Sequence, residues 1–207
     1  MDERVRQLSD QLVAKWTSPE GVRLMAAGTA VVGGLLEHGP LTEPQAAVLL
    51  GWPDDEVLAR FRAMNFGLEM DPGGVAVVGA GVSLNPALPH SMELRGGRRH
   101  GWCAMDVLMF PVAFQEEASR VTSRCAATGQ PISLTVTPRG VDDVDPSTAA
   151  VTLAPATGGD IRDVFCDRVN FYATPELARQ AVDVDPELAV CSVAEAWGIG
   201  KRLADLF

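Results

Sequence analysis

Apolar residues recur at helical spacing through the first third of the chain. Four of them fall on one side of a helix predicted over residues 3–16: Val5, Leu8, Leu12 and Trp16. Ser18 followed by Pro19 is typical of a capped helix start, and this second helix should run to about Leu36, where residues 37–40 stop it. The sequence therefore begins with two amphipathic helices.

Two shorter helices and a hairpin are predicted next. A helix should begin after Thr42 and end before Gly51, and Asp54-Asp55 should cap another that carries Val57 and Phe61. A turn at residues 71–74 then precedes two short β-like runs, at 75–78 and 82–84. Short helices followed by a hairpin are the outline of a winged helix.

The pattern changes after residue 85. We expect residues 86–100, which contain several arginines and glycines, to form a connection between domains, and residues 102–111 to be an apolar helical segment. Alternating residues predict a hairpin from 120–125 and 132–137, and further strands at 149–153 and in a β-rich run at 165–173. Two helices should close the chain: one at 175–182, and one after Ser192 with a capping box and with Trp197 and Leu203 facing inward.

These elements predict an α+β fold. We expect a winged-helix-like N-terminal helical domain at residues 1–95. An α+β domain of short antiparallel sheets and helices, at residues 96–207, should follow and carry the chemistry.

Charge and composition limit the function. The chain has 207 residues, of which 47% are hydrophobic and 21% charged, as in folded proteins. The net charge is −10, and the helix that would read DNA begins with acids at 54–56, so nucleic acid is a poor partner. No apolar run is long enough to span a membrane and no apolar signal region begins the chain, so we expect a cytoplasmic protein.

The cysteines carry the candidate chemistry. None of the four has the C-x-x-C spacing of a zinc ribbon, and the three histidines are scattered, so structural zinc is disfavoured. Cys103 and Asp106 lie three residues apart, on one face of a helix, among apolar neighbours that favour a protonated acid. A second thiol, Cys166, comes much later, and the hypothesis requires that it meets the first two residues.

Four segments resemble the alkylmercury lyase family, in that family's order and at similar spacing. They are WCAMDVLMFP at 102–111, SRCAATG at 123–129, FC at 165–166 and SVAEAWGIG at 192–200. The resemblance covers the chain from about residue 25 onward and is strongest after residue 100. It implies that Cys125 is structural, and it assigns no function to Cys191. Some relatives have two adjacent cysteines where this chain has Cys166-Asp167.

The resemblance implies an organomercurial lyase. Cys103 and Cys166 would bind mercury in a metal site that also includes Asp106, and Asp106 would deliver a proton to the departing carbon, giving a hydrocarbon and Hg(II). Soft thiolates suit mercury, and a carboxylic acid can act as the proton donor. No cofactor is implied, because mercury is substrate and product. The partners implied are organomercury compounds, small cytosolic thiols and a mercuric reductase that receives Hg(II).

Two other interpretations stay open at this point. The same thiols could hold Hg(II) or Cu(I) in a non-catalytic binding or sensing protein. Alternatively, the chain could be an acidic winged-helix interaction module whose cysteines are plain core. Asp106 distinguishes the lyase from a metal-binding protein, because only the lyase needs a proton donor.

Overall fold

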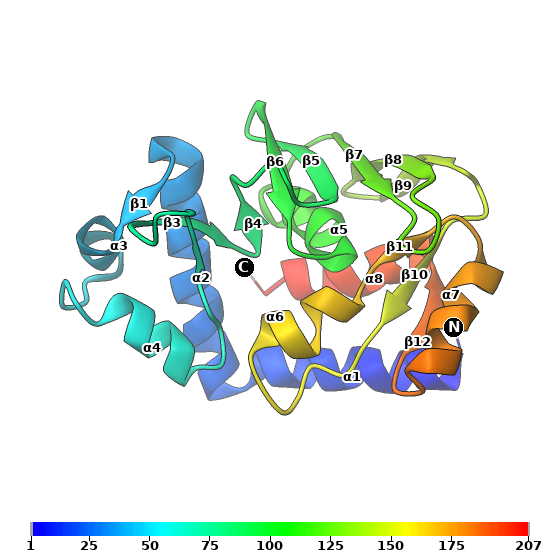
Figure 1. Cartoon of the computed structure of the whole chain (residues 1–207), viewed down its shortest axis with the longest axis horizontal. Helices are drawn as coiled ribbons and strands as arrows, with labels where there is room; N and C mark the ends of the chain where they lie inside the picture. Colours follow the sequence, from blue (N-terminus) through cyan, green and yellow to red (C-terminus); the bar gives the residue numbers. More distant parts are fainter. Residues whose placement is uncertain (1, 207) are drawn as a thin grey trace.

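The computed structural model describes residues 2–206, and its first part is helical (Figure 1). The helices are α1 (Glu3–Thr17), α2 (Pro19–His38), α3 (Glu43–Leu50) and α4 (Val57–Ala63). Ser18 caps α2 by accepting a hydrogen bond from Gly21 N, and Thr42 and Gln45 form a capping box at α3. The capping expected from Asp54-Asp55 is wrong. The N-cap residue of α4 is Glu56, and the Leu58 N–H donates to the Glu43 carboxylate of α3 instead.

An antiparallel sheet of long and short strands is formed from the middle of the chain, between residues Leu41 and Asp145. Its strand order is β1-β3-β4-β6-β5-β7-β8-β9, with β2 also paired to β3. The strands are β1 (Leu41–Thr42), β2 (Glu69–Met70), β3 (Ala76–Ala80), β4 (Val82–Ser83), β5 (His90–Leu94), β6 (Gly97–Gly101), β7 (Ser119–Arg124), β8 (Pro131–Thr137) and β9 (Gly140–Asp145). The expected hairpin at 120–137 is present as β7 and β8.

The connection expected at residues 86–100 is wrong. This stretch contains the β5–β6 hairpin, whose two-residue turn uses Arg95 and Gly96 at φ +50° and +70°. Positive φ at both positions matches the twist of a tight hairpin, and β5 is also paired with β7 through Ser91 and Met92. The domain boundary predicted between residues 95 and 96 falls within this turn, and the two-domain division stays a proposal.

The remaining elements form a second sheet and five helical segments. The second sheet has the order β11-β10-β12, from β10 (Ala150–Leu153), β11 (Phe171–Tyr172) and β12 (Ala189–Ser192). The helical segments are α5 (Ala104–Ala113), α6 (Ile161–Val164), η1 (Cys166–Arg168), α7 (Pro175–Val184) and α8 (Val193–Ala204). Cys166 was expected in a β-rich run, but it begins the 3-10 turn η1 between α6 and β11.

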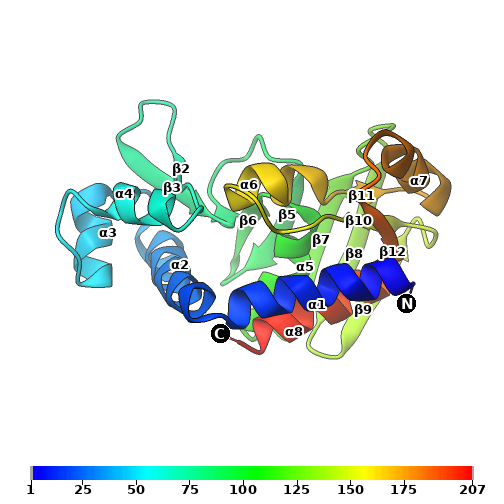
Figure 2. The same ribbon diagram turned by 90° about the horizontal axis from the view of Figure 1, so that it is seen from below.

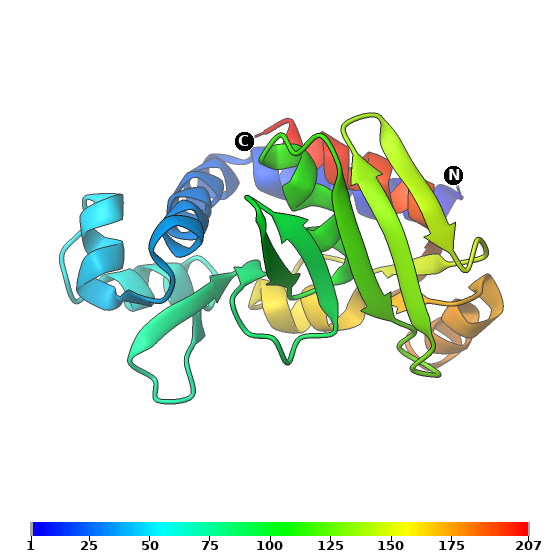
Figure 3. The same ribbon diagram turned by 90° about the horizontal axis from the view of Figure 1, so that it is seen from above.

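Helices α5 and α8 pack together behind the large sheet. Figure 3 shows β7, β8 and β9 in front of α8 (red) and α1 (blue), and Figure 2 shows α1 beside α8. Gly200 of α8 faces α5 at this contact, since a Cβ there would lie 3.4 Å from the Met109 backbone, an ordinary van der Waals distance. Arg202 joins the termini by donating to Ser9 and Asp10. The protein is therefore α+β. No helix within residues 2–206 is long and apolar enough to cross a membrane.

Candidate active site

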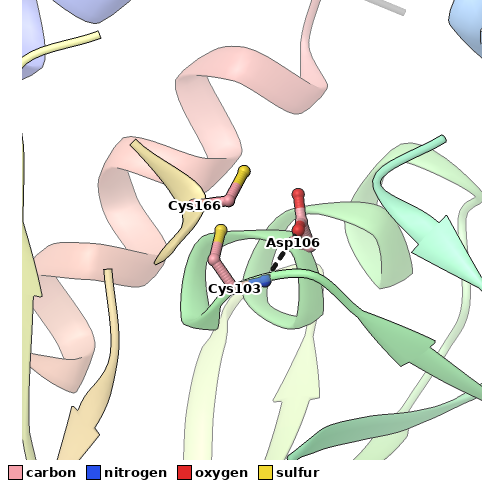
Figure 4. Close-up of side chains that lie close together, drawn as sticks. All are labelled: Cys103, Asp106 and Cys166. Atoms are coloured by element: carbon pink, nitrogen blue, oxygen red, sulfur yellow. Dashed lines mark hydrogen bonds between the residues drawn. The ribbon is translucent and has the colours of Figure 1, made fainter. Parts of the chain in front are cut away.

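The first turn of α5 positions a thiol and a carboxylate together. Cys103 is the N-cap residue, with extended backbone angles, and Asp106 is the third helical residue. The Cys103 backbone N–H donates to Asp106 Oδ2 at 2.9 Å, which fixes the carboxylate beside the thiol (Figure 4). Cys103 is completely buried and Asp106 is 8% exposed, so both groups sit out of bulk water.

Two glycines let the sheet approach this turn. A Cβ on Gly101 would lie 2.9 Å from the Asp106 Cβ, closer than side chains tolerate. Gly81 has φ +85°, and a Cβ there would lie 3.0 Å from the Phe110 ring. The Gly81 carbonyl accepts a hydrogen bond from the Trp102 N–H at 3.1 Å, directly before the thiol. The close backbone approach therefore defines where Cys103 and Asp106 lie.

The turn that holds Cys166 is attached to the same helix. Val169 O, just after η1, accepts a hydrogen bond from the Ala104 N–H in the first turn of α5 at 2.9 Å. The Thr152 hydroxyl of β10 donates to Arg168 O at 2.8 Å and accepts from the Asn170 N–H at 3.0 Å. The η1 turn is thus held between α5 and the second sheet.

The structure brings together the three residues that the sequence singled out. One ligand atom from each of Cys103, Asp106 and Cys166 lies within 4.8 Å of the others, and all three residues are buried (Figure 4). Figure 4 also shows the two sulfur atoms and the carboxylate pointing toward one another. Two thiols beside one acid form a donor set that suits a soft cation.

Burial sets the protonation of this cluster. It raises the pKa of Asp106 to about 7, against hydrogen bonds from Cys103 and the charge of Arg162 that lower it. Burial, the neighbouring Cys166 thiol and the Asp106 charge raise the pKa of Cys103 well above its ordinary range. The Cys103 hydrogen bond lowers the pKa of Cys166, but burial and nearby carboxylates outweigh it and raise that pKa. At neutral pH the thiols keep their protons and Asp106 can exchange one.

A charged network that the sequence analysis missed surrounds the cluster. The Arg162 guanidinium of α6 lies 5.0 Å from the Trp102 ring centroid and 3.9 Å from Glu69 Oε2. The Trp102 indole N–H donates to the same Glu69 oxygen at 2.7 Å, and Asn85 donates to the other at 2.9 Å. Glu69 and Arg162 belong to no recognisable motif or spacing in the sequence, so no local pattern could have identified them.

The other residues considered from sequence lie around the cluster or outside it. Arg168 is paired with Asp185 and Glu187, which ties η1 to the segment after α7, and Asp167 is exposed. Cys125 and Cys191 are buried, at 2% and 3% exposure, and neither belongs to the cluster. The core placement expected for both thiols agrees with this burial.

An apolar cavity of about 70 Å³ adjoins the cluster. Asp106 and Cys166 line it on one side, together with Trp102, as the sequence suggested for that indole. Residues of the N-terminal helices α1 and α2 also line it, as does Phe66, whose ring centroid lies 5.3 Å from that of Trp102. The cavity therefore lies between the N-terminal helices and the cysteine-bearing segments.

Comparisons with known proteins identify the family of the chain. A family model described as alkylmercury lyase (MerB) matches residues 82–205, a range that includes all three clustered residues. An alkylmercury lyase of Streptomyces lividans is 34% identical over 99% of this chain and 94% of its own length. The chain belongs to the alkylmercury lyase family. The family resemblance seen in the sequence is therefore confirmed.

Other alkylmercury lyases show the same relationship. The Pseudomonas putida enzyme is 38% identical over 80% of this chain and 76% of its own length, and the Staphylococcus epidermidis enzyme is 32% identical over 97% and 92%. The protein is thus an enzyme that cleaves the carbon–mercury bond of organomercury compounds.

The fold is also shared with a solved structure of this family. The mercury-bound form of MerB2 superposes with a TM-score of 0.74, covering 99% of each chain, although the sequences are only 19% identical. At that identity the match establishes a common fold, with helices and sheets in the same arrangement.

Proposed function

We propose that Cys103, Cys166 and Asp106 perform the carbon–mercury cleavage by protonolysis. The observation that carries this proposal is the convergence of two buried thiols and one buried acid within 4.8 Å. A hard-metal site would favour oxygen and nitrogen donors, whereas mercury(II) favours sulfur. The acid is the group that a binding site alone does not need.

The chemistry balances with these three groups. One thiol displaces the anion of R–Hg–X, giving a mercury–sulfur bond and HX. As the second sulfur binds mercury, its proton passes to Asp106, whose pKa of about 7 suits both gain and loss of a proton near neutrality. The Hg–C bond then breaks, its electron pair takes the proton from Asp106, and the hydrocarbon leaves. Mercury(II) stays on the two thiolates.

Product release and location follow from the same chemistry. Mercury held by two buried thiolates leaves by exchange with incoming thiols, so we propose small cytosolic thiols as acceptors and a mercuric reductase as a later recipient. The protein itself supplies both the mercury ligands and the proton, and we propose that it needs no cofactor and works in the cytoplasm.

We also propose that the N-terminal part, although winged-helix-like in its order of short helices and hairpin, serves the active site rather than DNA. Its helices α1 and α2 line the cavity beside Asp106 and Cys166, and the net charge of −10 would repel a phosphate backbone.

The test is hydrocarbon release by the reduced protein. Ethylmercury and phenylmercury are supplied with excess cysteine, and ethane and benzene are measured in the headspace. Cys103→Ser and Cys166→Ser should abolish release. Cys191→Ser, a buried thiol outside the cluster, is the matched control and should retain it.

The role of Asp106 is tested separately from binding. Asp106→Asn should still retain one mercurial per chain after desalting, but release hydrocarbon at least about 100-fold more slowly, the usual contribution of a positioned acid. Similar rates in this variant would show that another group supplies the proton. Stoichiometric retention by the unsubstituted protein without any hydrocarbon would indicate a soft-metal binding protein instead.

A further inference from the structure

The cavity beside the reacting groups is apolar, and helix α2 forms part of its lining. Met25, Gly28 and Thr29 of α2 line the same cavity as Asp106 and Cys166. A carbon bound to mercury between the two thiols would have to lie near Asp106 to receive its proton. The apolar cavity adjoins the position of this carbon. It is therefore suited to hold the remaining atoms of the organic group.

The size of the cavity limits what it holds without rearrangement. Its volume is about 70 Å³. An engineered cavity of about 150 Å³, lined by similar apolar side chains, binds benzene. The space here is about half of that, which is enough for a short alkyl group. A phenyl group is larger than this space, so it fits only if the lining side chains move or if part of the ring extends through the open side of the cavity.

Gly28 is the position on this wall where a side chain would occupy free space. Apart from neighbouring residues of α2 itself, no atom lies within 4 Å of the place where its Cβ would be, and Gly28 lines the cavity. Gly33 lies further along α2 and is equally unobstructed, but it does not line the cavity. The two glycines therefore form a matched pair, one within the lining and one outside it.

Resting on the proposed function, we propose that α2 sets the organic-group specificity of the enzyme. Gly28 and Met25 determine how large a group fits beside Asp106, and the unsubstituted cavity favours short alkyl groups over aryl groups. The N-terminal helices would then select the organic group, while the catalytic residues come from segments much later in the sequence.

The experiment compares methylmercury with phenylmercury in three variants. Gly28→Val narrows the cavity and should lower the phenyl-to-methyl ratio of kcat/KM about tenfold, within the range for one or two methylene-sized differences in an apolar pocket. Met25→Ala widens the cavity and should raise that ratio several-fold. Gly33→Val should leave the ratio within twofold of the original enzyme. If valine at position 28 prevents folding, Gly28→Ala gives a smaller shift in the same direction.

A binding measurement separates this inference from the proposed mechanism. In an Asp106→Asn background, methylmercury and phenylmercury compete at equilibrium for the protein, and the bound ratio is read without turnover. Gly28→Val should again disfavour phenylmercury, while Gly33→Val should not. Unchanged ratios in both assays, or equal losses for both compounds, would overturn the inference. Absence of hydrocarbon release in the original protein would refute protonolysis, and the competition ratio would still decide the role of α2.

Discussion

Replacing Asp106 by Asn should make the protein more stable at high pH while it loses activity. The carboxyl has a pKa of about 7 in the folded protein, above its ordinary value of 3.8, because burial disfavours its charge. Well below pH 3.8 the carboxyl is protonated in both the folded and the unfolded state, and burial of its charge does not lower the unfolding free energy. As the pH rises, the unfolded state loses its proton first, so stability falls until about pH 7 and then levels off.

The size of this effect follows from the two pKa values. The penalty is about 4 kcal/mol at pH 8 and about 2 kcal/mol at pH 5, because each pKa unit corresponds to about 1.4 kcal/mol. Asn cannot ionise, so Asp106→Asn removes the penalty at both pH values. The unfolding free energy of Asp106→Asn minus that of the original protein should therefore be about 2–3 kcal/mol larger at pH 8 than at pH 5. Any pH-independent cost of the new amide cancels from this comparison.

Urea unfolding of the reduced, mercury-free protein measures this difference. Both proteins are unfolded at pH 5 and pH 8 at constant ionic strength, and the free energies are extrapolated to water. Asp167→Asn, which changes an exposed carboxylate beside Cys166, is the control and should change the unfolding free energy by no more than about 0.5 kcal/mol. A stability change in Asp106→Asn that is the same at both pH values would refute the raised pKa, and with it the role of Asp106 as a proton carrier near neutrality.

Three further substitutions test the supports of the site. Gly81→Ala should destabilise by about 2–4 kcal/mol in urea, through positive φ and contact with a ring, whereas Gly74→Ala, at positive φ in open space, should cost about 1–2 kcal/mol; equal losses would contradict the close approach. Glu69→Gln should lower the unfolding free energy by about 1–3 kcal/mol because Arg162 loses its buried partner, and no loss would show that the pair is unimportant. Arg168→Ala should speed amide hydrogen exchange at residues 164–169, and unchanged exchange would exclude it as an anchor.

Local patterns were sufficient for most helices, whereas the candidate site residues Cys103, Asp106 and Cys166 were identified through the family resemblance. Apolar spacing and the Ser18 and Ser192 caps predicted α1, α2 and α8 to within a few residues, because these signals act over one or two turns. The β5–β6 hairpin was missed, since its arginines and glycines suggest a loop, and its pairing with β7 depends on residues 30 positions away. Cys166 was placed in a strand for the same reason: its 3-10 turn is held by bonds to α5 and β10, which no local pattern reveals.

By itself, the sequence determined the family and the candidate site residues: two thiols and an acid in an apolar setting, in the order of a mercury-cleaving family. The tertiary structure decided that these groups meet within 4.8 Å, that Glu69 and Arg162 lie beside them, and that α2 lines the adjoining cavity. The physical reason is that helix caps and apolar periodicity act between near neighbours. Convergence of a site depends on packing between segments that are distant in sequence, such as the approach of Gly81 to Phe110 and of Val169 to Ala104.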